Sequence, residues 1–318
     1  MKKTCETILE CIGETPLLRL GRLKKDLGFD GDIYAKLDHL NPSFSKKDRI
    51  ALGMVEAAER SGALKEGMPV IEMTSGNTGT GVALVCSAKG YRFICVMSVG
   101  NSVERVRMIR AFGGEVVLVD QAPGAVRGKV TGADLELVEQ ETERIVRETG
   151  GCFLNQFANA GNSLAQEQTA REIWGQSGGA VDAFADFVGT GGTFAGCAKG
   201  FKDIRQELHC YVVEPKGYAY YGGEVGAGGP GHRIQGGGYA KEMPLITPGL
   251  IDGCVSVSDE EAMGMTRALA RVEGVFAGFS SGANIAAAVR LLKGQEKGRG
   301  IAVVINDCGL KYMSTDLY

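Results

Sequence analysis

Short apolar runs alternate with longer amphipathic stretches along most of this chain. The runs are rich in β-branched residues and predict strands at 69–73, 92–97, 115–119, 184–188, 210–213, 254–257 and 301–305. The amphipathic stretches predict helices at 50–60, 78–89, 103–112, 135–149, 163–175, 194–206, 260–272 and 283–293. Strands that alternate with helices in this way favour mainly parallel sheets with helices on both faces.

Ligands of such folds bind beyond the carboxyl ends of the strands, so the turns that follow strands are the first places to look for chemistry. Three of these turns are unusually rich in glycine and small polar residues. They are T-S-G-N-T-G at 74–79, G-T-G-G-T at 189–193 and N-D-C-G at 306–309. A longer glycine-rich loop at 218–238 exceeds the length of an ordinary connection, which indicates a functional role.

Length and glycine content refine this picture. A chain of 318 residues suits two domains better than one. Its 48 glycines far exceed average usage and indicate many close backbone approaches. A fold that binds phosphate and carboxylate through main-chain N–H groups needs such approaches.

Charge and composition exclude several classes of protein. A net charge of −3 and a pI near 5.8, without a basic stripe, argue against nucleic-acid binding. Acidic residues interrupt the first 15 positions, and no later stretch reaches the roughly 18 apolar residues of a membrane span. The nine cysteines form no C-x-x-C pair, and the three histidines are scattered. We therefore expect a soluble cytoplasmic protein with reduced thiols and no metal.

The turn at 189–193 and the helix predicted after it would place several backbone N–H groups and two hydroxyls at a helix N-terminus. That arrangement suits a phosphate dianion, although a merely tight turn fits the same residues. It is not the dinucleotide fingerprint G-x-G-x-x-G, because the sixth position is Phe194. No G-x-x-x-x-G-K-[ST] segment of a nucleoside triphosphatase occurs either.

The turn at 74–79 offers a similar group of N–H donors with several polar side chains, which could bind a carboxylate or simply cap the next helix. In N-P-S-F-S-K-K-D-R at 41–49, two adjacent lysines precede a predicted helix. Lysines in such a place are usually solvated. One of them becomes a Schiff-base nucleophile if neighbours such as Lys46 and Arg49 lower its pKa.

Together these segments resemble the cysteine synthase family of pyridoxal 5'-phosphate (PLP) enzymes, which includes cystathionine β-synthases and is related to serine/threonine dehydratases. The resemblance covers almost the whole chain in the family's order. It rests on G-E-T-P-L at 13–17, the lysine motif at 41–49, T-S-G-N-T-G at 74–79, N-Q-F at 155–157, G-T-G-G-T at 189–193 and G-F-S-S-G-A at 278–283.

The resemblance implies a role for each motif. Lys47, directly before Asp-Arg, would be the catalytic Schiff-base lysine. The cofactor would also contact Asn77, Gly189, Thr190, Gly191, Gly192, Thr193 and Cys308. The substrate would contact Thr74, Ser75, Gly76, Asn77, Thr78, Gln156 and Gly236, with its carboxylate on the 74–78 loop and Gln156.

The implied fold is α/β, a fold-type II PLP enzyme similar to the tryptophan synthase β chain, with two domains that each have a twisted, mainly parallel sheet flanked by helices. The smaller domain, 1–12 and 35–150, would carry the carboxylate loop, and the larger, 13–34 and 151–318, would bind PLP. The implied reaction is β-replacement, in which O-acetylserine or O-phosphoserine and sulfide give L-cysteine through an aminoacrylate. The implied assembly is a homodimer that docks the C-terminal tail of serine acetyltransferase.

Departures from the family pattern keep other reactions open. Cys308 stands where cysteine synthases have the serine of P-D-S-G, and a neutral thiol there leaves the pyridine nitrogen unprotonated. Some serine dehydratases carry cysteine at that place, so a cysteine desulfhydrase or dehydratase-like lyase is an alternative. Cystathionine β-synthase-like condensation is another. Phe44 replaces a smaller residue, and Gly237 replaces the isoleucine of the family's H-K-I-Q-G-I-G.

Two further hypotheses come from other classes of protein. A catalytically silent family member could act as a binding partner, but the retained Lys47 argues against it. An NAD-dependent oxidoreductase would need a G-x-G-x-x-G unit followed by an acidic residue, which the sequence lacks.

Overall fold

The computed structural model describes residues 4–74, 76–101, 103–124, 132–225 and 231–318. The chain divides into two compact units. Unit 1 comprises Met1–Ile12 and Lys47–Asn162, and unit 2 comprises Gly13–Lys46 and Ser163–Tyr318.

These limits differ from the predicted domain boundaries in two segments. Residues 35–46 belong to unit 2, because the strand that ends at Lys36 pairs with a strand at Gly300–Val304 of that unit. Residues 151–162 belong to unit 1, because Cys152–Phe153 pairs with a strand of its sheet. Sequence patterns alone do not reveal these partners, which are distant along the chain.

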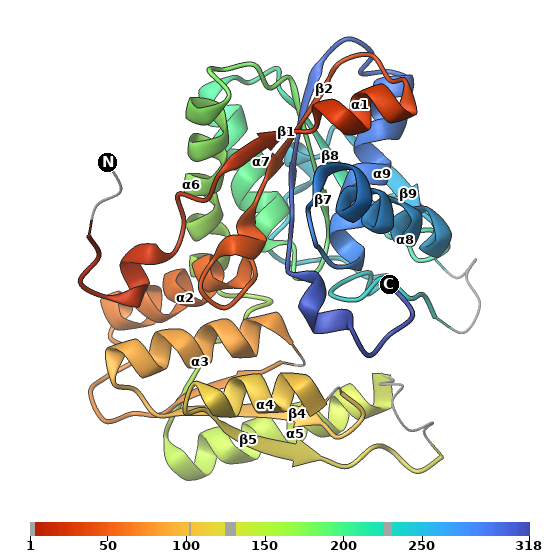
Figure 1. Cartoon of the computed structure of the whole chain (residues 1–318). Coiled ribbons are helices and arrows are strands. Elements are labelled where there is room, and N and C mark those ends of the chain that lie inside the picture. Colours follow the sequence, from red (N-terminus) through yellow and green to blue (C-terminus); the bar gives the residue numbers. More distant parts are fainter. Residues whose placement is uncertain (1–3, 75, 102, 125–131, 226–230) are drawn as a thin grey trace. The chain divides into compact units, whose positions relative to one another are not determined.

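Unit 1 is built on a parallel sheet with helices on both faces (Figure 1). Its strands lie in the order β5 (Glu115–Val119), β4 (Phe93–Ser98), β3 (Val70–Met73) and β6 (Cys152–Phe153). Its helices are α2 (Lys47–Ser61), α3 (Asn77–Lys89), α4 (Val103–Ala111) and α5 (Gly132–Thr149), after a 3-10 turn, η1, at Ile8–Cys11.

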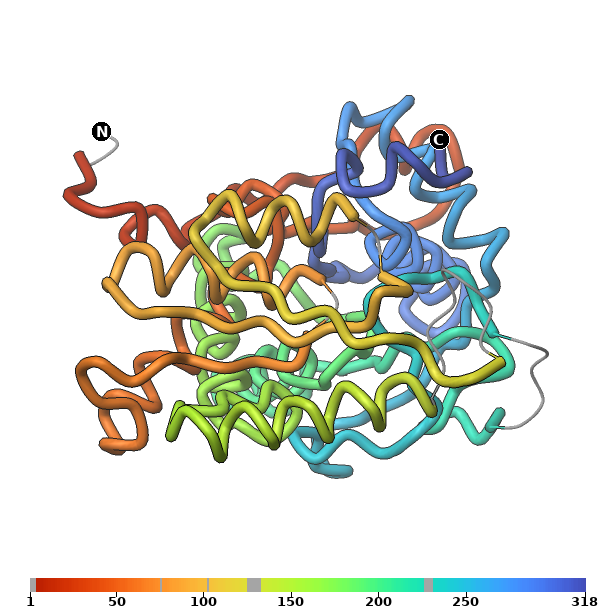
Figure 2. The backbone as a smooth tube through the Cα atoms, turned by 90° about the horizontal axis from the view of Figure 1, so that it is seen from below, coloured from red at the N-terminus to blue at the C-terminus, as the bar shows by residue number. Residues whose placement is uncertain are grey.

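Successive side chains along these strands point to opposite faces of the sheet, and each face packs into its own hydrophobic core. Val70 and Phe93 pack with residues of α2, α3 and α4 on one face. Ile71, Ile94 and Val96 pack on the other face against α5, whose yellow-green coil lies alongside the strands in Figure 2. Both faces are apolar, as expected of a parallel sheet covered on both sides.

Unit 2 contains a six-stranded sheet in the order β1 (Leu17–Arg19), β2 (Asp32–Lys36), β10 (Gly300–Val304), β7 (Ala183–Phe187), β8 (His209–Pro215) and β9 (Gly253–Val257). Only the β1–β2 pair of this sheet is antiparallel. The helices are α1 (Gly21–Leu27), α6 (Ala160–Gln176), α7 (Gly192–Ile204), α8 (Asp259–Ala268), which continues as a π-helical turn, η4 (Leu269–Glu273), and α9 (Phe279–Lys293). Short 3-10 turns occur at η2 (Asp38–Leu40), η3 (Pro248–Leu250) and η5 (Gly309–Tyr312).

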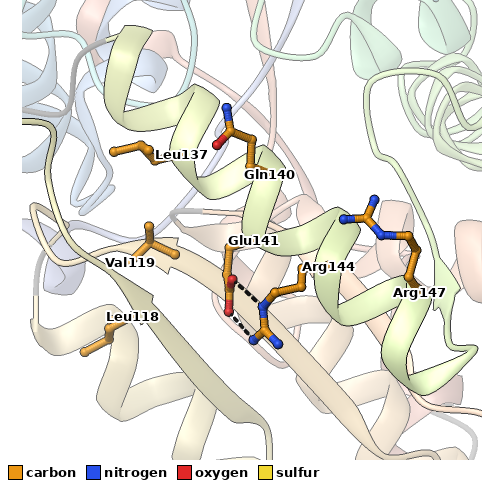
Figure 3. Close-up of a pocket in the computed structure, with 7 residues that line it drawn as sticks. All are labelled: Leu118, Val119, Leu137, Gln140, Glu141, Arg144 and Arg147. Atoms are coloured by element: carbon orange, nitrogen blue, oxygen red, sulfur yellow. Dashed lines mark hydrogen bonds and ion pairs between the residues drawn. The ribbon is translucent and has the colours of Figure 1, made fainter.

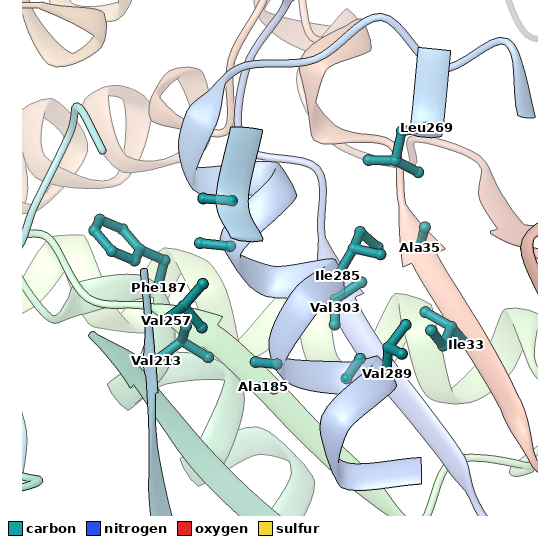
Figure 4. Close-up of a cluster of buried hydrophobic side chains, with 14 of the residues drawn as sticks. Ile33, Ala35, Ala185, Phe187, Val213, Val257, Leu269, Ile285, Val289 and Val303 are labelled. Carbon is teal, nitrogen blue, oxygen red and sulfur yellow. The ribbon is translucent and has the colours of Figure 1, made fainter. Parts of the chain in front are cut away.

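The core of unit 2 also has two sides. Ile285 and Val289 of α9 pack against strand residues such as Ile33, Ala185 and Val303 (Figure 4). On the opposite face, Phe194 and Phe201 of α7 contact Phe184 of β7, with ring centroids 6.3 and 5.4 Å from its ring. This double cover keeps β7 and β10 buried, so their carboxyl ends are held rigidly.

The predicted α/β class with mainly parallel sheets is confirmed. All seven predicted strands and eight predicted helices are present, with small shifts at their ends. The sequence did not predict β1, β2, β6 or α1. Each of these elements is short, and Asp32–Lys36 begins and ends on a charged residue, which masks its apolar interior.

Candidate functional site

Two adjacent lysines lie at the start of α2, and the structure distinguishes them. Lys46 precedes the helix, and Lys47 is its first residue. The Lys46 side chain is 9% exposed, and its Nζ lies 2.9 and 3.1 Å from the two carboxylate oxygens of Asp186. A buried ammonium held by both oxygens of a carboxylate is a poor nucleophile, so this environment disfavours Lys46 as a Schiff-base residue.

The segment before α2 is fixed within unit 2 by a small antiparallel ribbon. Isolated antiparallel β-bridges join Ser45 to Asp307 and Cys308 to Ala277. Backbone hydrogen bonds of 2.9 and 3.1 Å join the segments around Ser45 and Asp307. Lys46 and Cys308 therefore lie on neighbouring extended segments, although they are far apart in the sequence.

Phe44, one of the predicted departures, lies in the left-handed region with φ of +66°. Its N–H donates to the Asn41 carbonyl at 2.8 Å, and its own carbonyl accepts from the Cys308 N–H at 3.1 Å. Such a conformation costs about 1 kcal/mol or more for a residue with a side chain. The ribbon and turn together hold this strained residue within the lysine motif, three positions before Lys47.

The predicted carboxylate loop lies between β3 and α3 in unit 1. The Thr78 hydroxyl donates to Gln156 Oε1 at 2.7 Å, and Gln156 Nε2 donates to the Met73 carbonyl at 3.2 Å. Thr74 and Thr78 are both buried. The structure therefore brings Thr78 and Gln156 together, although 78 positions separate them. Ser75, also predicted here, lies outside the described residues.

The start of α3 shows whether the turn at 74–79 only caps this helix, which was the alternative to a carboxylate site. Its N-cap is Gly76, which has no side chain and makes no side-chain cap bond, and Asn77 is the first helical residue. The N-cap side chain therefore does not satisfy the first N–H groups of the helix. A helix N-terminus in this state attracts negative charge, which suits a carboxylate.

Glu72 is a residue that the sequence analysis missed. It lies on β3, is 1% exposed, and its Oε1 accepts the Gln156 N–H at 3.3 Å. Burial raises the pKa of its carboxyl to about 8, against the lowering effect of hydrogen bonds from Gln156 and Asn155 and of the Lys47 charge. At neutral pH this side chain is therefore mostly uncharged. An acidic residue inside the apolar run V-I-E-M was the signal that could have revealed it.

The predicted phosphate loop follows β7 in unit 2. Thr190 and Thr193 are 5% and 4% exposed. Gly191, the N-cap of α7, has φ of +85° and makes no side-chain cap bond. This conformation requires glycine, and it leaves the N–H groups of the first turn without a cap from a side chain. The geometry suits an anion at the N-terminal end of α7.

The phosphate loop packs tightly against the loop that contains Gly236. A Cβ atom on Gly189 would lie 2.4 Å from the Gly236 carbonyl oxygen. A Cβ on Gly237 would lie 2.2 Å from the Val188 carbonyl oxygen. Both distances are shorter than van der Waals contact, so only glycine fits. This packing explains Gly237 where the family pattern has isoleucine.

The G-F-S-S-G-A segment positions the C-terminal motif. Ser281 Oγ accepts the Asn306 backbone N–H at 2.9 Å, and Asn306 Nδ2 donates to Ser280 Oγ at 3.0 Å. Two residues later, Cys308 is partly exposed and is the N-cap of η5. The serines at the start of α9 thus fix the segment that carries Cys308.

The predicted site residues fall in both units. In unit 1 the described ones are Lys47, Thr74, Gly76, Asn77, Thr78 and Gln156. In unit 2 they are Gly189, Thr190, Gly191, Gly192, Thr193, Gly236 and Cys308. The predicted carboxylate loop at the start of α3 thus belongs to unit 1, and the predicted phosphate loop at the start of α7 belongs to unit 2.

A groove of about 440 Å³ on unit 1 lies elsewhere, between β5 and α5 (Figure 3). Val119 and Leu137 contribute apolar surface, while Arg144 is held by Glu141 at 2.7 Å. The described residues that line this groove include none of the predicted site residues.

Within the described ranges, no helix is long and apolar enough to cross a membrane. The same residues contain no group of three His, Cys, Asp or Glu side chains that could hold a metal ion.

Comparison with known proteins gives a full-length match. The family model described as "Pyridoxal-phosphate dependent enzyme" matches residues 8–309. The cysteine synthases of Staphylococcus aureus strains Mu50 and N315 are each 37% identical to this chain over 321 aligned positions. These alignments cover 100% of this chain and 98% of each relative.

Solved structures give a similar result. O-acetyl serine sulfhydrylase isoform 3 from Entamoeba histolytica has a TM-score of 0.90 and 33% identity, over 100% of this chain and 92% of that one. A hydrogen sulfide-producing enzyme from Fusobacterium nucleatum has a TM-score of 0.89 and 34% identity, over 98% and 99%. An O-ureido-L-serine synthase has a TM-score of 0.88 and 33% identity, over 99% and 95%.

Proposed function

Because this chain belongs to the family of pyridoxal-phosphate dependent enzymes, we propose that it is a cysteine synthase. The reaction joins sulfide to the β-carbon of O-acetylserine or O-phosphoserine and releases acetate or phosphate. The observation that carries the proposal is the Thr78–Gln156 pair at the uncapped start of α3, in the unit that also contains Lys47. Such a pair suits the α-carboxylate that every substrate of this reaction carries.

The residues present fit the cofactor. Gly191 is the N-cap of α7 and makes no side-chain cap bond, so the N-terminal end of this helix suits a phosphate dianion. The buried Thr190 and Thr193 lie beside it in the sequence. The close approach of Gly189 to the Gly236 carbonyl leaves no room for a side chain, so main-chain atoms line the loop. When bound, PLP supplies an electron sink that stabilises negative charge at the substrate's α-carbon.

We assign the chain's own residues as follows. Lys47 would hold the cofactor through its Nζ and, once released as an amine, remove the α-proton. Thr78 and Gln156 would hold the substrate carboxylate, together with Thr74, Gly76 and Asn77. Cys308 would face the pyridine nitrogen as a neutral partner. The uncharged Glu72 would support Gln156 without adding a negative charge beside the substrate carboxylate.

The direct test is product analysis with purified holoenzyme, O-acetylserine and sulfide. We expect L-cysteine and acetate in equal amounts, and neither product from a Lys47→Ala variant. A Lys65→Ala variant is the matched control, since Lys65 is an exposed lysine of the same unit and lies outside the predicted site. Cysteine formation that survives in Lys47→Ala would refute the assignment of Lys47, and its absence in the native protein would refute the synthase.

A second candidate is a lyase that converts cysteine to pyruvate, ammonia and hydrogen sulfide. Two observations favour it, namely Cys308 and the similarity to an enzyme described as hydrogen sulfide-producing. Incubation with cysteine alone, without sulfide, separates the two reactions through the yield of pyruvate. Homocysteine in place of sulfide tests the condensation that gives cystathionine.

The remaining expectations stay predictions. A homodimer, docking of a serine acetyltransferase tail and a cytoplasmic location are implied by the family resemblance. Molecular mass in solution and titration with a C-terminal peptide of such an acetyltransferase would test the first two.

A further inference from the structure

A buried polar network surrounds Asp186 in unit 2. Its carboxylate binds the Lys46 ammonium and also accepts from Asn284 Nδ2 at 3.1 Å. Asn284 further donates to the Val304 carbonyl at 2.8 Å and accepts the Phe187 N–H at 2.6 Å through Oδ1. Asp186 and Asn284 are at most 1% exposed. The network is therefore shielded from water and has well-defined partners.

Each member of this network belongs to a segment that leads into a predicted motif. Lys46 ends the stretch before Lys47, and Asp186 lies on β7, three residues before the phosphate loop. Asn284 lies in the first turns of α9, after the serines that hold Asn306. The network thus joins the lysine motif and the phosphate-loop strand through side chains, and Asn284 continues it to the backbone of β7 and β10.

Lys46 is held at three points. Its Nζ binds Asp186, its backbone N–H donates to the Asn306 carbonyl at 2.9 Å, and its own carbonyl accepts from Gln166 Nε2 at 3.5 Å. The next residue along the chain is Lys47. A residue fixed at its side chain, N–H and carbonyl leaves little freedom in the peptide that begins Lys47.

Stability does not require charges at this place. Desolvation of two ions opposes their attraction, and apolar pairs of similar volume are often equally stable. An ion pair instead fixes geometry, because its hydrogen bonds define one arrangement of the partners. An experiment can therefore measure the effect on stability and the effect on geometry separately.

We propose that Lys46, Asp186 and Asn284 form a positioning network that anchors the start of Lys47 to the strand leading into the phosphate loop, and that PLP affinity depends on it. The inference rests on the proposed roles of Lys47 and of residues 189–193. These are positioning residues, because none of them is assigned a contact with cofactor or substrate.

The test compares the stability of the apoprotein with its affinity for PLP. In the double variant Lys46→Met/Asp186→Val, we expect apoprotein stability in denaturant close to that of the native protein, because no unpaired charge is left buried. The dissociation constant for PLP, from absorbance titration of the apoprotein, should rise about tenfold or more. The dissociation constant for inorganic phosphate should remain within about twofold, since the phosphate loop itself is intact.

The Lys36–Glu172 pair offers a matched control. It is the same kind of buried ion pair in unit 2, with an N–O distance of 2.6 Å and side chains 0% and 7% exposed. Lys36→Met should lower apoprotein stability and leave the PLP dissociation constant unchanged. If instead it weakens PLP binding as much as the double variant does, the loss reflects general destabilisation and the proposal fails.

Two further measurements keep the outcomes distinct. If the double variant does not fold, Lys46→Met/Asp186→Asn gives the same comparison, because it leaves no buried charge and keeps an acceptor for Asn284. Native-like PLP affinity in a folded variant lacking the ion pair overturns the positioning role. Lys47→Ala serves as the reference for the proposed function, because loss of covalent attachment in this variant tests Lys47 itself. A Lys47→Ala protein that still attaches PLP covalently would refute the function rather than the network.

Discussion

Two turns of similar composition, 74–79 after β3 and 189–193 after β7, are built in different ways. Each precedes a helix whose N-cap glycine makes no side-chain cap bond. A buried acidic residue precedes each turn as well, Glu72 on one strand and Asp186 on the other. Burial keeps Glu72 largely protonated, whereas Asp186 is paired with Lys46.

The surroundings of the turns differ too. The first is lined by side chains that bond one another, such as Thr78 and Gln156. The second packs backbone against backbone, with Gly189 on Gly236. Side chains can adjust to a ligand that changes at every turnover, whereas packed backbone suits a ligand that stays. The difference supports the assignment of substrate carboxylate to the first turn and cofactor phosphate to the second.

The largest effect is expected from Gly189→Ala. The new Cβ would lie 2.4 Å from the Gly236 carbonyl oxygen, so the phosphate loop must shift. A displacement of this size should weaken PLP binding by about 100-fold or more, because phosphate contacts depend on placement within about 1 Å. Titration of the apoprotein with PLP measures the change.

Gly21→Ala is the matched control, since a Cβ there meets nothing within 4 Å and the residue begins α1 of the same unit. It should leave PLP affinity unchanged. Equal PLP affinity in Gly189→Ala and Gly21→Ala would contradict a rigid backbone cradle.

The second effect concerns stability and pH. The pKa of Glu72 is raised to about 8 in the folded state, from a usual value of 4.5. Between these values the folded state binds one more proton than the unfolded state, so this group's contribution to stability falls as pH rises through the window. Glu72→Gln removes that dependence. The variant should gain in unfolding free energy over the native protein from pH 4.5 upward, by on the order of 3 kcal/mol at pH 7.

Chemical denaturation at several pH values measures this difference. Glu115→Gln in the same unit is a useful control, because the hydrogen bond from Arg92 lowers the pKa of the exposed Glu115 and gives a dependence of opposite sign. A pH-independent difference between native and Glu72→Gln proteins would mean that Glu72 is ionised in the folded state.

The sequence predicted most of the fold, because buried parallel strands are continuous apolar runs such as F-I-C-V-M at 93–97. The six residues of the first turn and the five of the second were also predicted, since motifs are local. The Lys46–Asp186 pair could not be, because its members are 140 positions apart and a single sequence carries no sign of pairing. The protonated state of Glu72 depends on burial, which is likewise a tertiary property. Local sequence motifs were thus predictable, whereas the contacts between residues distant along the chain were not.

The smallest expected effect uses a pair of equivalent threonines. Thr78→Val keeps the shape of the side chain and removes the hydroxyl that donates to Gln156. Thr193→Val likewise removes a buried hydroxyl from the second turn and keeps the side-chain shape. One lost hydrogen bond is worth about 1 kcal/mol, or roughly fivefold in binding. Thr78→Val should therefore raise the dissociation constant of O-acetylserine about fivefold and leave that of PLP unchanged. Thr193→Val should do the reverse, with both constants read from the cofactor's absorbance. Equal changes of both constants in each variant would show that the turns do not divide substrate from cofactor. A crossed result would support the view that the first turn binds the substrate and the second binds the cofactor.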